Sequence, residues 1–318
     1  MKSKHTRRDF LRAAGVGAAS VAAAGEVFGQ GRTPASDRVL PDRPTVPPRP
    51  MERKFELGMA SYTLRKFKLD EAIAMTRRVG LKNIALKDFH LPMNATADEI
   101  KAVAAKVKDA GLNLYGCGVV YMRSQADVDR AFEYARTAGM TTIIGVPNHD
   151  LLPLVDKKVK EYDIAVAIHN HGPGDKVYPT PASVYEKVKD LDPRIGLCMD
   201  IGHTVRIGED PIRDTMRFAD RLLDVHIKDV SAAEAKGSTV EIGRGIIDIP
   251  GFIRALLRIG YAKYVSFEYE KDENDPMPGL AESVGYVNGV MATIANPGFT
   301  RPRPQPAPGR LVRPEPAR

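Results

Sequence analysis

Two histidines flank an asparagine in the stretch 164-IAVAIHNHGPG-174, directly after a short apolar run. Residues i and i+2 of a β-strand point to the same face, so His169 and His171 would project side by side from the end of a buried strand. Paired imidazoles can bind a transition metal or transfer protons. A lone histidine at a strand end more often only makes hydrogen bonds, so the function of this pair depends on the polar residues around it.

Similar polar residues follow other apolar runs along the chain. Five of the seven histidines lie at or just beyond the ends of predicted strands four to seven. Enzymes built on parallel barrels carry their catalytic residues at these carboxyl ends, so the clustering favours a functional site. The predicted strand ends carry Lys87, Asp88 and His90; Asn148 and His149; His169, Asn170 and His171; Asp200 and His203; His226, Lys228 and Asp229; and Glu268 and Glu270.

Four of these residues are candidate metal ligands. They belong to four different predicted strands that would end at one mouth of a closed barrel, and they are His169, Asp200, His226 and Glu268. Imidazole and carboxylate ligands suit Mn²⁺, Zn²⁺, Fe²⁺ or Co²⁺. No thiolate accompanies them, which disfavours a closed structural zinc site. The sequence therefore predicts an open divalent-metal site that polarises substrate oxygens.

The elements that position these residues alternate between strand and helix over a catalytic domain at residues 55–296. Short apolar runs predict eight strands, at 55–61, 82–87, 112–118, 141–146, 164–170, 195–200, 222–227 and 263–268. Amphipathic spacing predicts helices between them, each closed by a glycine, at 69–80, 96–111, 127–139 and 250–260. This alternation indicates an α/β fold of the (β/α)8 barrel type. An open doubly wound sheet is the alternative, although the loop 61-SYTLRKFKL-69 lacks the glycines of a dinucleotide-binding turn.

The two ends of the chain lie outside this pattern. Residues 1–30 place the paired Arg7 and Arg8 before an apolar run rich in Ala and Gly, which is typical of a bacterial twin-arginine export signal rather than of an amphipathic helix. The run is too short to favour a membrane span. Residues 31–54 and 297–318 are rich in Pro and Arg and predict a linker and a tail. We therefore expect a periplasmic or extracellular protein that engages the twin-arginine export machinery and no membrane after signal removal.

Most of the positive charge lies at these ends. The chain has a net charge of +7, and residues 1–30, 31–54 and 301–318 carry +3, +3 and +4, which leaves residues 55–300 at −3. A basic surface would suggest binding to nucleic acid. Because the predicted domain is slightly acidic, we expect no nucleic-acid partner.

Four stretches carry a resemblance to a known family. The pieces are 195-IGLCMDIGH-203, 225-VHIKDV-230, 243-GRGIID-248 and 265-VSFEYE-270. They resemble the later half of the sugar isomerase/epimerase superfamily with the xylose-isomerase-like TIM barrel, which also contains inosose dehydratases and an endonuclease branch. The resemblance covers about residues 55–292 in organisation. It implies a TIM barrel with a divalent metal, most often Mn²⁺, with Zn, Fe, Co or Mg as the other candidates.

The resemblance also implies a ligand set. In that superfamily a Glu of strand five, an Asp of strand six, a His of strand seven and a Glu of strand eight hold the metal, and the last three match Asp200, His226 and Glu268. The strand-five position is His169, so a symmetric epimerase with two glutamates is not expected. The His-x-His pair instead resembles dehydratase-like members, with His171 as an acid, a base or a substrate-orienting residue.

The remaining polar residues receive roles from the same implied chemistry. Metal bound to a substrate oxygen stabilises the charge that forms when a base removes the adjacent proton. Glu268 or His171 would be that base, and His203 and Lys228 would donate hydrogen bonds to substrate hydroxyls or to the developing oxyanion. Three residues are candidates for substrate binding: Lys87, Arg244 and Glu270. The alternative for Lys87 is an ion pair with a neighbouring carboxylate, and the alternative for Arg244 is a position in a surface turn. The alternative for Glu270 is a carboxylate that faces solvent.

Three functions follow from these residues. The leading hypothesis is a metal-dependent sugar isomerase or epimerase that transfers a proton next to a carbonyl on a carbohydrate or polyol. The second is a dehydratase or lyase acting on a keto-sugar or keto-glycoside, and the third is a periplasmic carbohydrate-binding barrel without turnover. An endonuclease would need more carboxylate ligands and a basic rim. All three leading functions imply a small-molecule carbohydrate partner, and the sequence leaves the oligomeric state open.

Overall fold

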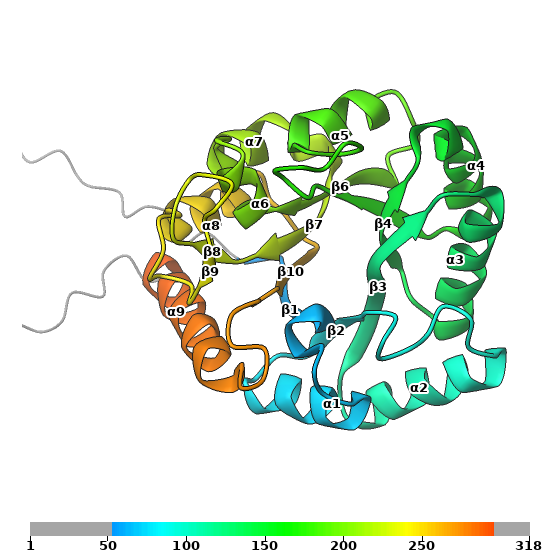
Figure 1. The fold of residues 1–318 in the computed structure, drawn as a ribbon, viewed down its shortest axis with the longest axis horizontal. Coiled ribbons are helices and arrows are strands. Elements are labelled where there is room, and N and C mark those ends of the chain that lie inside the picture. The colour runs from blue at the N-terminus through cyan, green and yellow to red at the C-terminus, as the bar shows by residue number, and fades with distance from the viewer. Residues whose placement is uncertain (1–52, 296–318) are drawn as a thin grey trace, which may run out of the picture. The chain divides into compact units, whose positions relative to one another are not determined.

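Eight parallel strands close into a barrel with helices around its outside (Figure 1). The computed structural model describes residues 53–295, so the predicted export signal, nearly all of the linker and the tail lie outside the described residues. The strands neighbour one another in the order β1-β10-β7-β6-β5-β4-β3-β2. The predicted (β/α)8 barrel is therefore confirmed, and an open sheet is excluded.

The barrel strands are β1 (Glu56–Ala60), β2 (Asn83–Leu86), β3 (Asn113–Met122), β4 (Thr142–Pro147), β5 (Ala165–His169), β6 (Ile195–Asp200), β7 (Leu222–Ile227) and β10 (Tyr264–Phe267). The helices are α1 (Leu69–Arg78), α2 (Ala97–Asp109), α3 (Gln125–Ala138), α4 (Leu152–Tyr162), α5 (Pro181–Val188), α6 (Ile201–Arg206), α7 (Pro211–Arg217), α8 (Ile249–Arg258) and α9 (Met277–Ala295). Shorter elements are η2 (Ser61–Leu64), η3 (His149–Leu151), η4 (Ala219–Arg221) and the two-stranded β8 (Asp229–Val230) and β9 (Thr239–Val240).

The strands are apolar on both faces because one face fills the barrel and the other packs against helices. Every residue of β2, β4 and β6 is buried. The helices contribute the matching apolar stripe: in α8, for example, Phe252, Ile253 and Leu256 are buried. The result is one continuous core between the strands and the surrounding helices.

Local capping explains where two of the predicted helices begin and end. Thr96 accepts a hydrogen bond from the backbone N–H of Glu99, and the Glu99 carboxylate accepts one from the Thr96 N–H, which fixes the start of α2. Gly139 follows α3 with φ 71°, a left-handed conformation that favours glycine. None of the helices within residues 53–295 has both the length and the apolar character needed to cross a bilayer.

Strand β3 is longer than the sequence pattern predicts. Its pairing with β4 shifts between Cys117 and Val120, and the strand then resumes to Met122. Gly118 lies in this irregular stretch with φ 150°, and a Cβ there would stand 2.4 Å from the carbonyl oxygen of Ile144. The irregularity carries Tyr121 to the carboxyl-terminal mouth of the barrel.

Candidate functional site

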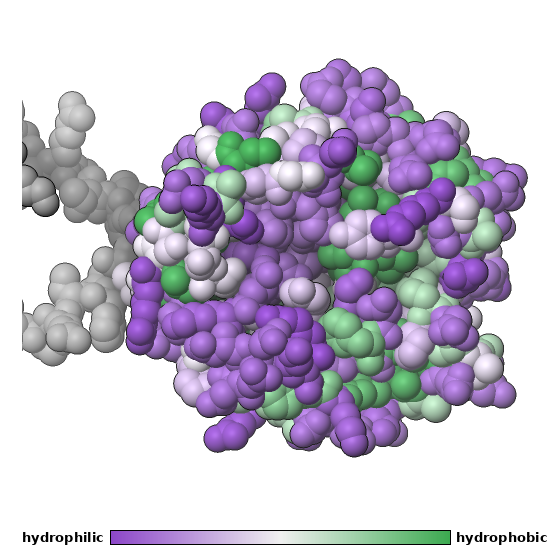
Figure 2. All heavy atoms as spheres, in the orientation of Figure 1, coloured by the Kyte–Doolittle hydropathy of each residue, from purple (hydrophilic) through white to green (hydrophobic). Residues whose placement is uncertain are grey.

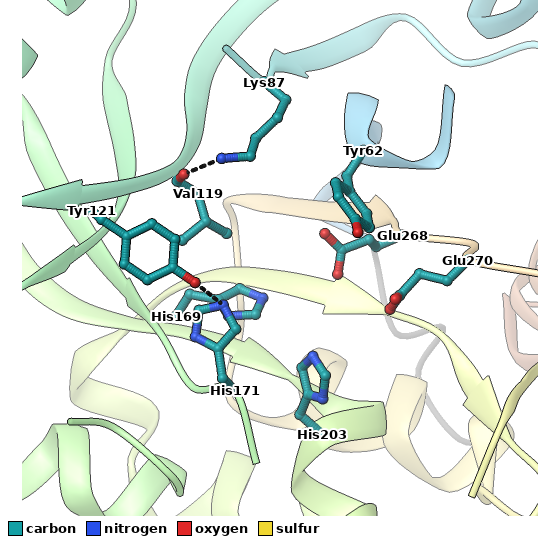
Figure 3. Close-up of a pocket in the computed structure, with 9 residues that line it drawn as sticks. All are labelled: Tyr62, Lys87, Val119, Tyr121, His169, His171, His203, Glu268 and Glu270. Atoms are coloured by element: carbon teal, nitrogen blue, oxygen red, sulfur yellow. Dashed lines mark hydrogen bonds between the residues drawn. The ribbon is translucent and has the colours of Figure 1, made fainter. Parts of the chain in front are cut away.

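A cavity of about 290 Å³ opens at the carboxyl ends of the strands. On the face shown in Figure 2, hydrophilic residues surround the central hollow and hydrophobic residues gather on one side of it. Six predicted site residues line the cavity, together with Tyr62, Val119 and Tyr121 (Figure 3). The six are Lys87, His169, His171, His203, Glu268 and Glu270.

The parallel register brings the predicted metal ligands to one level. Asp200 and His226 are Cα partners in the ladder between β6 and β7. His169 is the last residue of β5, and Glu268 directly follows β10, where its N–H donates to the Ile227 carbonyl at 3.2 Å. Neighbouring parallel strands therefore end at the same level, as expected for a site at the mouth of a barrel.

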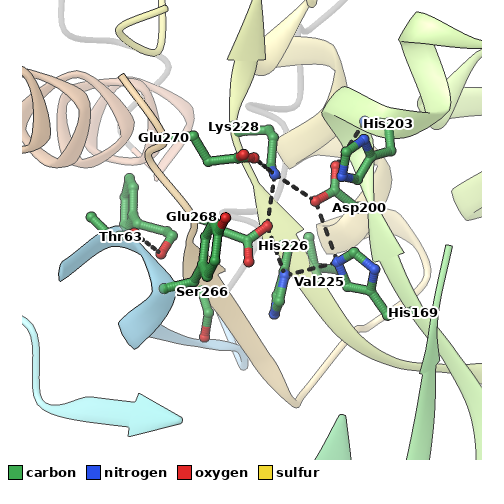
Figure 4. Close-up of polar contacts among 12 residues, drawn as sticks. Thr63, His169, Asp200, His203, Val225, His226, Lys228, Ser266, Glu268 and Glu270 are labelled. Carbon is green, nitrogen blue, oxygen red and sulfur yellow. Dashed lines mark hydrogen bonds and ion pairs between the residues drawn. The ribbon is translucent and has the colours of Figure 1, made fainter. Parts of the chain in front are cut away.

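The four side chains converge beside the cavity, which His169 and Glu268 line. Each of the four residues offers one atom that could bind a metal, and these four atoms all lie within 4.8 Å of one another. The residues are His169, Asp200, His226 and Glu268. His169 Nε2 lies 3.1 Å from His226 Nδ1 and 3.5 Å from Asp200 Oδ2 (Figure 4). His226 Nδ1 lies 3.3 Å from Glu268 Oε2. Two imidazoles and two carboxylates packed this closely match the ligand types of a divalent transition metal, so the residues fit the predicted ion.

Asp200 is held in place by the start of α6. Its Oδ1 accepts a hydrogen bond from the His203 N–H at 2.8 Å, which caps the helix, while Oδ2 faces His169. Asn170 fixes the backbone from the neighbouring strand, because its Oδ1 accepts from the Asp200 N–H at 3.0 Å and its Nδ2 donates to Thr204 Oγ1 at 3.2 Å. The aspartate orientation is thus set by the fold.

Lys228 lies among three carboxylates rather than in the cavity. Its Nζ is 2.9 Å from Asp200 Oδ2, 2.6 Å from Glu268 Oε2 and in contact with Glu270 Oε1 (Figure 4). Its side chain is 2% exposed. Its stem packs on Gly202, where a Cβ would stand 2.5 Å from Lys228 Cγ. The expected hydrogen bond from Lys228 to substrate is therefore not available in this arrangement, and Lys228 instead positions the carboxylates.

Burial and charge set the protonation of the site. Burial lowers the pKa of His169 to about 3, which leaves its imidazole neutral. Burial alone would lower the pKa of His226, but Cys198 and Glu268 raise it well above its usual value. Burial alone would also raise the pKa of Asp200, yet the Lys228 ammonium holds that pKa well below the ordinary range. Both aspartate oxygens therefore serve as acceptors at neutral pH.

Two cavity-lining residues form contacts with the protein as well. His171 Nε2 lies 3.1 Å from the Tyr121 hydroxyl, and burial lowers the pKa of His171. Lys87 donates to the Val119 carbonyl at 2.6 Å and lies 3.5 Å from Asp88 Oδ1, so the expected ion pair is present while its side chain still borders the cavity.

Arg244 is not brought to this cavity. The Asp229 carboxylate accepts the backbone N–H groups of Gly243 at 2.9 Å and of Gly245 at 3.0 Å, which folds the loop between them around a buried acid. The Arg244 side chain points outward, is 62% exposed and pairs with Glu282 at 2.7 Å. The expected substrate contact is therefore corrected to a surface ion pair.

Two other strand-end histidines have structural contacts. His90 is buried, with its ring nitrogens 2.9 Å from Ser61 Oγ and 3.1 Å from the Phe67 carbonyl. His149 Nε2 lies 3.1 Å from the Val177 carbonyl. Neither residue lines the cavity.

The sequence reasoning missed two aromatic residues of the cavity. Tyr62 lies in η2, directly after β1, and the same strand-end argument that selected the histidines could have selected it. Tyr121 was missed because β3 was expected to end at Gly118, three residues earlier.

Comparison with known proteins places these features in context. Residues 68–289 match the family described as xylose isomerase-like TIM barrel. The chain is 26% identical over 147 residues to the rhizopine catabolism protein MocC of Rhizobium meliloti, covering 42% of this chain and 45% of that protein. It is 28% identical over 153 residues to an inosose dehydratase of Lacticaseibacillus casei, covering 42% and 50%. The chain thus spans about half the length of the curated relatives it matches.

Solved structures share the fold at low sequence identity. An L-ribulose 3-epimerase superposes with a TM-score of 0.63 at 18% identity, covering 79% of this chain and all of that one. A structure of the IOLI protein with a bound zinc atom superposes with a TM-score of 0.61 at 18% identity, covering 77% of this chain and all of that one. These likenesses extend over the barrel.

Proposed function

The chain belongs to the xylose isomerase-like TIM barrel family, and we propose that it is a divalent-metal-dependent enzyme that transfers a proton next to a carbonyl of a carbohydrate or polyol. The observation that carries this proposal is the convergence of two imidazoles and two carboxylates, within 4.8 Å of one another, in a cluster of which His169 and Glu268 line the cavity. A divalent cation held there would polarise a substrate oxygen and so acidify the neighbouring C–H group.

The side chains of the site have different roles in the proposed reaction. Glu268 and His171 both line the cavity, and in the proposal one removes the substrate proton while the other returns it. His203 and Glu270 also line the cavity and would orient substrate hydroxyls. Lys228 does not touch the substrate: it keeps the carboxylates of the site in place.

A dehydratase or lyase in the same barrel is the second candidate. The end of β5 presents the imidazoles of His169 and His171, so this side of the cavity offers nitrogen bases. The neutral imidazole of His171 can take the proton from the carbon beside the carbonyl and then, as an imidazolium, donate that proton to the departing hydroxyl. The similarity to an inosose dehydratase, at 28% identity over part of the chain, supports this candidate as well.

Proton NMR in D₂O separates the two reactions. The full chain, loaded with Mn²⁺ or Zn²⁺, is mixed with ketoses and keto-glycosides, and EDTA stops the reaction before the spectrum is recorded. Deuterium on the carbon beside an intact carbonyl indicates an isomerase or epimerase, whereas loss of water or of an aglycone indicates a lyase. If no compound exchanges a proton although one binds, the enzyme proposal fails and a binding protein is favoured.

Metal analysis tests the ligand set independently of activity. His169→Ala and Asp200→Ala should each weaken Zn²⁺ binding by at least tenfold in calorimetry, because each removes one ligand of four. His149→Ala is a matched control, since His149 binds the Val177 carbonyl outside the cavity. If both ligand variants bind Zn²⁺ as tightly as the control, the metal site is wrong.

We also propose that residues 1–30 direct export by the twin-arginine route, on the sequence layout alone. Fusing these residues to a reporter that is active only after export tests the proposal. Replacing both Arg7 and Arg8 by Lys should abolish export; unchanged export would contradict the twin-arginine assignment.

A further inference from the structure

Tyr121 and His171 together form a flat wall on one side of the cavity. The tyrosine hydroxyl lies 3.1 Å from His171 Nε2, the ring planes are 23° apart and the ring centroids are 5.8 Å apart. Both residues line the cavity, and Tyr121 is 46% exposed. Because the two rings are nearly parallel and are joined through the tyrosine hydroxyl, they form one aromatic side of the cavity rather than two separate contacts.

This wall is supported from outside the cavity. The guanidinium of Arg123 lies over the Tyr121 ring, 5.4 Å from its centroid. Asp175 Oδ2 lies 3.5 Å from His171 Nδ1, and the other oxygen of Asp175 accepts the N–H groups of Val177 at 2.6 Å and Tyr178 at 2.8 Å. The wall is therefore held in position before any ligand binds, which reduces the entropy lost on binding.

A second aromatic ring stands across the cavity. Figure 3 shows Tyr62 and Tyr121 on opposite sides, with the carboxylates of Glu268 and Glu270 on the side of Tyr62. The guanidinium of Arg65 lies 4.8 Å from the Tyr62 ring centroid and donates to the Glu270 carbonyl at 3.0 Å, so this hydrogen bond holds the guanidinium against the Tyr62 ring. The cavity thus combines flat aromatic sides with polar groups between them.

We propose that the cavity binds its substrate as a closed, polyhydroxylated six-membered ring, with one C–H face of that ring against the Tyr121 ring of this wall and its edge toward His171. The face of an aromatic ring carries negative charge density and attracts weakly positive C–H groups. A closed ring offers a flat C–H face and directs its hydroxyls outward toward the polar side chains. An open chain offers no such face and loses more conformational freedom on binding.

This inference rests on the proposed function for the identity of the reactive group, but ring selection can be measured without turnover. Calorimetry with the Zn²⁺-loaded full chain compares three non-reacting polyols: methyl β-D-glucopyranoside and myo-inositol, which are closed rings, and sorbitol, which is an open chain. The wild-type protein should bind at least one closed ring more tightly than sorbitol. Tighter binding of the glucopyranoside would indicate that the natural ligand is a sugar ring, and tighter binding of myo-inositol would indicate a cyclitol.

Substitution of the wall tests its part in the preference. Tyr121→Leu keeps apolar volume but removes the flat ring, and it should weaken closed-ring binding by roughly fivefold to tenfold while sorbitol binding changes less than twofold. Tyr121→Phe keeps the ring and loses the hydroxyl, so it should retain most of the preference. Tyr286→Leu is a matched control on α9, because Tyr286 is also solvent-exposed, at 39%, and does not line the cavity.

Two results would overturn the inference: sorbitol binding as tightly as both closed rings, or a preference that Tyr121→Leu leaves unchanged. Its failure is distinct from failure of the proposed function. If closed rings bind preferentially but no keto compound exchanges a proton, the enzymatic proposal falls and ring selection stands. If proton exchange occurs equally well with erythrulose, a ketose too short to form a six-membered ring, ring selection falls and the enzymatic proposal stands.

Discussion

Replacing Lys228 by Met separates the electrostatic role of its ammonium from the packing of its stem. Methionine keeps an unbranched chain against Gly202 and removes the positive charge. In the wild-type protein that charge lies 2.9 Å from Asp200 Oδ2 and 2.6 Å from Glu268 Oε2. The same two oxygens face His169 and His226. The variant therefore keeps all four proposed metal ligands but removes the ammonium that compensates the charge of the two carboxylates.

The expected cost in the metal-free protein is large because the charges are buried. Removing one partner of a buried ion pair typically destabilises a protein by about 3 to 5 kcal/mol, since the remaining charge is left without compensation. A divalent cation at the same oxygens would restore most of that compensation, so the metal-loaded variant should lose only about 1 kcal/mol. By thermodynamic linkage the difference, about 3 kcal/mol, must appear as tighter metal binding, which corresponds to roughly 100-fold.

Two measurements on the same protein test this reasoning. Urea unfolding with EDTA gives the stability of the metal-free forms, and calorimetry with Zn²⁺ gives the metal affinity. Lys158→Met is a suitable control, because Lys158 of α4 pairs with Asp129 of α3 at 2.7 Å, away from the proposed metal site. Such a pair between outer helices contributes about 1 kcal/mol or less to the stability of the protein. The control should change neither the metal affinity nor the difference between the metal-free and metal-loaded stabilities.

The reasoning is refuted if Lys228→Met leaves the metal-free stability unchanged, because the buried carboxylates would then not depend on the ammonium. It is equally refuted if the variant binds Zn²⁺ more weakly than the wild type. Weaker binding would mean that Lys228 organises the ligands for the metal instead of competing with the metal for their charge.

Three further predictions concern residues around the site. Asp229→Asn should cost about 2 to 3 kcal/mol in urea unfolding, because the Asp229 carboxylate accepts four backbone N–H groups and an amide can accept only part of them; an unchanged stability would contradict this. The ion pair with Lys271 lowers the pKa of Glu241 to about 2, so the wild type should exceed Glu241→Gln in stability by about 1 kcal/mol above pH 4.5. That difference should vanish as the pH falls toward 2 in melting curves, and a pH-independent difference would refute the assignment. Arg244→Ala should change kcat/KM less than twofold, because Arg244 pairs with Glu282 outside the cavity, and a loss above tenfold would show that Arg244 reaches the substrate.

The barrel could be predicted because its signals are local and repeated. Each strand is a short apolar run, each helix shows three- and four-residue spacing, and glycines such as Gly139 mark the helix ends. These signals place the strand ends to within a few residues. Because parallel strands of a closed barrel end at one mouth, the positions of Asp200 and His226 relative to one another follow from the strand assignment alone.

The direction of long polar side chains could not be predicted in the same way. Lys228 lies two residues after His226 and was expected to face the substrate, but its ammonium pairs with three carboxylates, one at the end of β6 and two just after β10. Arg244 depends on a loop that folds around Asp229, a residue 15 positions earlier in the chain. Such contacts between distant segments leave no periodic trace in the sequence.

Charge balance at the site connects its stability to its proposed use of a metal. Asp200, Glu268, Glu270 and Lys228 together carry a charge of −2 when ionised, and one divalent cation brings this group to neutrality once His226 has released its proton. Lys228 supplies part of the compensation at all times, so the fold of the site does not depend entirely on the metal. In a closed structural zinc site, by contrast, metal binding supplies the folding free energy itself. We therefore expect that the metal can be removed reversibly with only a moderate loss of stability, because the proposed role of the ion is catalytic rather than structural.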